Sequence, residues 1–115
     1  MAARTIPTPS ARTMCFNVQS GYKVAITFAG TARVFSLLIT TAGATNYNSM
    51  HLVSGYSTSD GTHFINTIVS GTMISVDKVS GKVEVSSSGS SGYRVSITPL
   101  FEDPGGVSAA LVSAT

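Results

Sequence analysis

The sequence has few charged residues, a single cysteine and no tryptophan. Charged residues make up 10% of the 115 positions, whereas an average soluble domain has about 25%. Seven basic and five acidic residues do not form the basic patch that binding to nucleic acid requires. The surface must therefore be built from small polar side chains, and the chain carries 18 serines and 14 threonines.

The single cysteine, Cys15, excludes an intrachain disulfide and a cysteine-rich metal site. Because the apolar residues Met14 and Phe16 flank it, we expect a buried or half-buried thiol rather than a catalytic one. The fold must then hold without covalent cross-links. This is compatible with assembly in a cytoplasm.

Long apolar runs are also missing. No run approaches the length of about 18 residues that would cross a bilayer, and the N-terminus does not resemble a signal peptide. We therefore expect no insertion into a membrane. The mean hydropathy of +0.29 and the many β-branched residues argue against a disordered chain.

No segment has the apolar spacing of an amphipathic helix, and apolar residues instead recur with a period of two. This pattern predicts strands at residues 13–18, 22–28, 33–41, 47–54, 63–69, 72–78, 82–86 and 93–100. The first two strands, joined by Ser20-Gly21, predict a hairpin with one buried face. Residues 33–41 are more continuously apolar and predict a central strand, and Pro99 is expected to end the last strand.

These strands predict an all-β fold, an antiparallel β-sandwich of about eight strands with a jelly-roll-like arrangement. Crossover helices are missing, which excludes a parallel sheet. We expect one domain at residues 13–101. Residues 1–12 contain Pro7 and Pro9 and predict an extended N-terminal arm, and residues 102–115 predict a C-terminal arm.

A core of this size without tryptophan is modest, and the strand edges carry few charges to protect them from pairing with other chains. Copies of the chain can cover one another's edges and apolar faces. We therefore expect a homo-oligomer.

The polar residues do not form a recognisable catalytic or metal-binding motif. His51, His63 and Asp60 lack the spacing of a zinc site. Asp77 and Glu84 lie on either side of a Ser80-Gly81 turn, with lysines beside them, and predict surface pairing across two strands rather than a glycosidase site. Neither a nucleophile elbow nor a phosphate-binding loop occurs. We expect no enzymatic activity, no cofactor and no bound metal.

Two polar loops contain residue types that can bind a sugar, by ring stacking and by hydrogen bonds to hydroxyl groups. The first is the loop at residues 55–62, and the second follows the strand at residues 33–41. The candidate ligand-binding residues are Tyr56, Ser57, Asp60, His63, Asn46 and Tyr47. An ordinary turn-rich loop is the alternative interpretation of both segments.

Several segments carry a resemblance to a known class of proteins. They are Phe16-Asn17-Val18-Gln19-Ser20-Gly21-Tyr22, Leu52-Val53-Ser54-Gly55-Tyr56, Asn66-Thr67-Ile68-Val69-Ser70-Gly71, Gly81-Lys82-Val83-Glu84-Val85 and Ser91-Gly92-Tyr93-Arg94-Val95-Ser96-Ile97. Together they resemble the small terminal domains of phage tail fibres and viral fibre heads. The resemblance implies a homotrimeric antiparallel sandwich that attaches a virion to a receptor on the host cell surface, often a glycan.

The resemblance predicts a non-enzymatic virion protein that is assembled in the host cytoplasm and binds a cell-surface glycan or protein receptor. The chain departs from fibre proteins in having no shaft after Met1. The alternative is therefore a structural virion protein, such as a capsid decoration or tail-adaptor subunit. Such a protein would dock on other virion proteins through the arms at residues 1–12 and 102–115. A free carbohydrate-binding module or adhesin is a third interpretation.

Overall fold

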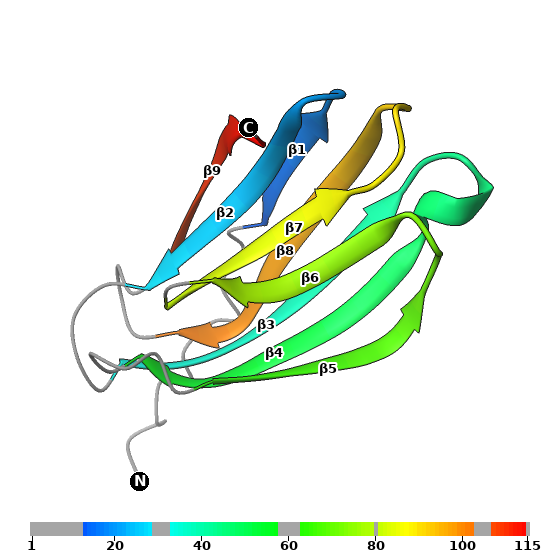
Figure 1. The fold of residues 1–115 in the computed structure, drawn as a ribbon. Helices are drawn as coiled ribbons and strands as arrows, with labels where there is room; N and C mark the ends of the chain where they lie inside the picture. Colours follow the sequence, from blue (N-terminus) through cyan, green and yellow to red (C-terminus); the bar gives the residue numbers. More distant parts are fainter. Residues whose placement is uncertain (1–12, 29–32, 58–62, 80, 103–106, 115) are drawn as a thin grey trace, which may run out of the picture.

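The computed structural model describes residues 13–28, 33–57, 63–79, 81–102 and 107–114. Within these ranges the chain forms two antiparallel sheets (Figure 1). The elements are β1 (Met14–Val18), β2 (Tyr22–Phe28), β3 (Arg33–Ala42), the 3-10 helix η1 (Thr45–Tyr47), β4 (Ser49–Ser57), β5 (His63–Ser70), β6 (Ile74–Val79), β7 (Lys82–Ser87), β8 (Tyr93–Glu102) and β9 (Val107–Ser113). The five-stranded sheet has the order β1-β8-β3-β4-β5, and the four-stranded sheet has the order β6-β7-β2-β9. The expected antiparallel all-β fold is confirmed.

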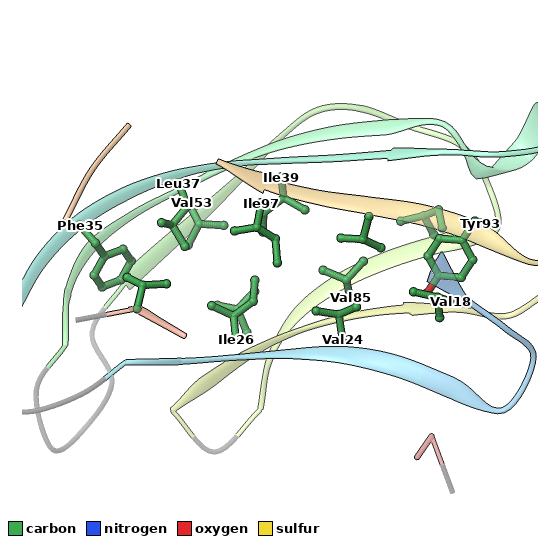
Figure 2. Close-up of a cluster of buried hydrophobic side chains, with 14 of the residues drawn as sticks. Val18, Val24, Ile26, Phe35, Leu37, Ile39, Val53, Val85, Tyr93 and Ile97 are labelled. Carbon is green, nitrogen blue, oxygen red and sulfur yellow. The ribbon is translucent and has the colours of Figure 1, made fainter. Parts of the chain in front are cut away.

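The core lies between the two sheets in a sandwich-like arrangement (Figure 2). Apolar residues at alternating positions of β2, β3, β7 and β8 point into it, as the alternation predicts. Tyr93, Val95 and Ile97 do so from β8 and are almost completely buried. At one end of the core the rings of Phe28 and Phe35 stack, with their centroids 4.2 Å apart.

The expected central strand is confirmed. β3 lies between β8 and β4 and pairs with both along most of its length. Its inward residues Phe35, Leu37 and Ile39 are buried, and the outward Leu38 is half-buried between neighbours on both sides.

The predicted hairpin of the first two strands is wrong. The turn itself forms, because Tyr22 N donates to Gln19 O at 3.1 Å and Gly21 has a φ of 89°. However, β1 pairs with β8, whereas β2 pairs with β7 and β9 in the other sheet. Alternation shows that each strand has one buried face, but it does not distinguish a partner beside the strand from one across the core.

The C-terminal segment is not an arm. Residues Val107–Ser113 form β9, which pairs along the whole of β2 from Phe28↔Val107 to Tyr22↔Ser113. Beyond the strand, Ala114 N donates to Gly21 O at 2.8 Å. The domain boundary expected at residue 101 is therefore too early. The N-terminal arm at residues 1–12 lies outside the described residues.

Pro99 does not end β8. The strand continues to Glu102, and its pairing with β3 shifts register between Ser36 and Leu37, next to the proline. A bulge accommodates a residue without a backbone N–H. Among the described residues, pairing with β1 ends at Met14↔Ile97, and Pro99 has a strand neighbour only in β3.

Candidate functional site

The candidate residues in the two loops lie at opposite ends of β4. Asn46 and Tyr47 belong to η1, just before the strand, whereas Tyr56 and Ser57 are its last two residues and His63 begins β5. A strand of nine residues is about 30 Å long, so these residues do not form one site. Tyr56 and Ser57 were expected in a loop but belong to the strand, and Asp60 lies outside the described residues.

Tyr47 is part of the core rather than of an exposed loop. Its side chain is 5% exposed, and its ring centroid lies 5.8 Å from that of Tyr93. Its phenol oxygen accepts a hydrogen bond from Ser91 N at 3.2 Å, which lowers the pKa of Tyr47. The ring therefore anchors the β7–β8 connection and offers no free face to a sugar. Asn46, by contrast, is exposed.

His51 points into the core from β4 and is 2% exposed. Its Nδ1 atom has no hydrogen-bond partner. Burial lowers the pKa of His51, and the negative charge of Asp77 opposes this effect. The described residues contain no group of three histidine, cysteine or acidic side chains that could hold a metal ion.

Asp77 and Glu84 face each other across the β6–β7 hairpin, whose turn contains Gly81 with a φ of 78°. Glu84 forms an ion pair with Lys23 on the neighbouring strand β2, with Nζ and Oε1 2.9 Å apart. The expected pairing of Glu84 across strands is present, but its partner comes from β2 rather than from the hairpin. The Lys23–Glu84 pair stabilises the outer surface of the four-stranded sheet.

A hollow lies elsewhere, on the outer face of the five-stranded sheet. Three strands form it, because β1 and β3 flank β8 (Figure 1). Its volume is about 400 Å³, within the range of about 300–1,000 Å³ that is typical of small-molecule sites. The outward-facing residues that line it are Cys15, Asn17, Thr40, Ala42, Arg94 and Ser96. We call this hollow the Arg94 groove.

The strand register orders these residues in two rows. In one row Asn17, Arg94 and Ala42 lie side by side on β1, β8 and β3. In the other row Cys15, Ser96 and Thr40 lie side by side on the same strands. Residues directly opposite each other have Cβ atoms about 5 Å apart, so all six side chains surround one small area.

Several polar side chains in the Arg94 groove are available for hydrogen bonds to a ligand. In the described part of the chain, the side chains of Asn17, Thr40 and Arg94 have no hydrogen-bond or ion-pair partner. Arg94 is the only charged residue among those that line the groove. The guanidinium group has five donors and no acceptor, so the groove presents a surplus of donors to a ligand.

A second hollow of about 530 Å³ continues the groove toward the end of the sheet. It shares Asn17, Ala42 and Arg94 with the first and adds Gln19 and the two glycines at positions 43 and 92. A Cβ atom at Gly92 would lie 3.2 Å from the Gln19 side chain, so larger residues would narrow the hollow. Arg94 therefore lies between two connected spaces.

Cys15 is exposed in the Arg94 groove, contrary to the expectation of a buried or half-buried thiol. Met14 and Phe16 point toward the core, and the strand alternation turns Cys15 the other way. Its Sγ atom lies 3.9 Å from Ser96 Oγ, as a weak donor. The thiol is thus a natural reporter group at the candidate site.

The residues of the Arg94 groove are not among the predicted ligand-binding residues, which lie in or next to loops, where functional residues concentrate. The alternation of residues 93–97 does indicate that Arg94 and Ser96 face away from the core. It does not indicate that Asn17 and Thr40 are their neighbours, since both contacts depend on pairing between distant strands. An arginine on the outer face of a strand with few charges was the available signal.

No family model matches the sequence, and neither a curated protein nor a solved structure is similar to it. No helix in the described part of the chain is long and apolar enough to cross a membrane. The site must therefore be interpreted from its own geometry and chemistry.

Proposed function

We propose that the protein is a non-enzymatic virion protein, a fibre-head-like attachment domain that binds a host cell-surface glycan through the Arg94 groove. The observation that carries this proposal is the set of unused polar groups on Asn17, Thr40 and Arg94 around one open hollow. Sugars are recognised by such groups, because each hydroxyl both donates and accepts hydrogen bonds. The described lining contains no carboxylate or histidine that could act as a general acid or base.

The order of the strands supports a jelly-roll-like arrangement. β1 lies beside β8, β2 beside β7, and β4 beside β5, so the chain folds back on itself in nested pairs as in a Greek key. β3 and β6 do not form the remaining nested pair, because β6 follows β7 at the edge of the other sheet.

We further propose that the protein forms a homotrimer. Large apolar side chains are exposed on edge strands, with Ile68 on β5 59% exposed and Leu111 on β9 42% exposed. Neighbouring copies would cover these residues and the open strand edges. Light scattering is expected to give three times the chain mass of 11.8 kDa, and a monomer at high concentration would contradict the trimer.

A glycan array probed with the purified protein tests the attachment function, together with binding to host cells. We expect selective binding that Asn17→Ala weakens, because this change removes an amide from the groove without affecting the core. Ser108→Ala, on the exposed side of β9, is the matched control and should bind as the wild type does. A complete lack of binding to the array and to cells would overturn the proposal.

The alternative, a structural virion protein that docks through two arms, has lost part of its basis because Val107–Ser113 form β9. Docking would now depend on residues 1–12 alone. If deletion of residues 1–12 abolishes incorporation into particles while the Arg94 groove binds no glycan, the structural role replaces the attachment role. Asp60, in the candidate loop at residues 55–62, lies outside the described residues and stays a prediction.

A further inference from the structure

We infer that the ligand of the Arg94 groove is an acidic sugar, whose carboxylate or sulfate group binds to the Arg94 guanidinium. This inference rests on the proposed function, since it names the class of glycan that the same groove would take. It goes further in assigning one charged group on the ligand to one side chain of the protein.

The residues that line the groove carry one positive charge. Arg94 is the only charged residue lining either hollow, and within the described ranges no carboxylate pairs with it. Elsewhere on the protein a cation does have such a partner, because Lys23 pairs with Glu84 at 2.9 Å. A guanidinium that stays charged at all relevant pH values and lacks an internal partner favours an anionic group on the ligand.

The space beside Arg94 has a shape that suits a planar anion. Ala42 lies beside Arg94 on β3, and its methyl group leaves space next to the guanidinium. Planar anions such as a carboxylate bind arginine through two parallel hydrogen bonds, which need an unobstructed side of the group. On the opposite side, Asn17 supplies both a donor and an acceptor.

The distance from Arg94 to the hydroxyl groups of Ser96 and Thr40 matches the size of a sugar ring. Ser96 is two residues from Arg94 on β8, which places the two Cα atoms about 7 Å apart. Thr40 lies beside Ser96 on β3. A single sugar ring whose acidic group contacts Arg94 would therefore place its ring hydroxyls near Ser96 and Thr40.

A nucleic acid is a poorer match for the groove. Its binding needs several cations that follow a row of phosphates, whereas a single arginine lines the two hollows. The two aromatic residues that line the hollows, Phe16 and Tyr93, pack toward the core, with Phe16 half-buried and Tyr93 buried, so neither presents a free ring face on which a base could stack. One cation surrounded by amide and hydroxyl groups matches one acidic group surrounded by hydroxyls.

The test measures binding of four soluble probes: sialyllactose, a glucuronic-acid disaccharide, a sulfated lactose and neutral lactose. Wild type, Arg94→Ala, Arg94→Lys and the control Lys82→Ala are compared. Lys82 is exposed on β7, in the other sheet, so its loss changes the net charge equally without touching the groove. Thermal unfolding of each variant confirms that the fold is intact.

We expect at least one acidic probe to bind, and Arg94→Ala to weaken its binding by about tenfold or more. Arg94→Lys should retain part of the affinity, because lysine keeps the charge but loses the two-pronged geometry. Lys82→Ala should bind as the wild type does. The acidic probe should also slow alkylation of Cys15, which lines the groove, and neutral lactose should not.

Three outcomes would overturn the inference, and they differ in what they say about the proposed function. If neutral lactose binds as well as the acidic probes and Arg94→Ala has no effect, glycan attachment stands but the acidic ligand is wrong. If acidic probes bind without protecting Cys15 and without dependence on Arg94, the site is elsewhere. If no glycan binds to these probes or to the array, both proposals fall. Comparing the carboxylated with the sulfated probes shows which anion the groove prefers.

Discussion

Arg94 and Asn17 are direct cross-strand partners on β8 and β1, although most of the chain separates them in sequence. Neither side chain has a partner within the described part of the protein. The two residues are neighbours only because β1 pairs with β8 in the five-stranded sheet and not with β2. The change of sheet at Gly21 therefore creates the candidate site.

Cys15 should react with a thiol reagent in the folded protein, because its side chain is exposed on the outer face of β1. We expect complete labelling under native conditions, followed by mass spectrometry. The control is Val18→Cys in a Cys15→Ser background, which places the only thiol at a fully buried position of the same strand. Equal reactivity at both positions would contradict the orientation of β1.

Stability should fall as the pH is lowered from 7 to 5. Burial lowers the pKa of His51 in the folded state, so the unfolded chain binds a proton at a higher pH than the native protein. Acidification below the ordinary histidine pKa of about 6.5 therefore favours unfolding. Urea unfolding at pH 7 and pH 5 measures the effect.

His51→Leu should remove much of this pH dependence. It also eliminates a buried nitrogen without a hydrogen-bond partner, so we expect a gain of about 1–2 kcal/mol at pH 7. A variant that keeps the wild-type slope between pH 7 and pH 5 would show that other groups cause it.

Gly89→Ala should destabilise the protein by about 1–3 kcal/mol, because the added Cβ atom would overlap the Tyr47 phenol oxygen. Tyr47→Phe removes that oxygen and its hydrogen bond from Ser91, at a cost of about 1 kcal/mol. In the double variant the overlap with the oxygen is gone and a milder one with the ring carbon Cζ, at 2.8 Å, is left, so the two effects should sum to more than the measured loss. Strict additivity in chemical denaturation would disprove the contact.

Two neighbouring substitutions in β9 distinguish a strand from an arm. Ala109 is partly buried against the core, whereas Ala110 is exposed. Ala109→Asp should lower the unfolding free energy by about 2 kcal/mol or more, and Ala110→Asp should change it by less than about 0.5 kcal/mol. If thermal unfolding finds both variants equal to wild type, the C-terminal segment does not belong to the sheet.

Local patterns predicted the parts of the fold that depend on local properties. The period of two predicted the strand at residues 93–100, whose Tyr93, Val95 and Ile97 are buried, and the apolar run at residues 33–41 predicted the central strand. The pattern failed at β9, where three small residues are followed by Leu111 and Val112 and the contrast between the two faces is weak.

The candidate site was less predictable than the fold. Tyr47 lies in a polar segment that predicts an exposed loop, but its ring turns inward and packs beside Tyr93. The Arg94 groove depends on the register of three strands that are distant in sequence. A one-residue slip of β1 would turn Asn17 into the core, and no local property of residues 13–18 fixes that register.

Within the described ranges, the five-residue strand β1 pairs with one neighbour, β8. Any ligand that contacts both Asn17 and Arg94 would connect β1 to β8 and so stabilise the position of β1 in the sheet. Ligand binding in the Arg94 groove and local unfolding of β1 are then thermodynamically linked, because the groove is incomplete when β1 separates from β8. Amide exchange along Met14–Val18 should slow when the groove is filled, so the edge of the sheet reports on ligand capture.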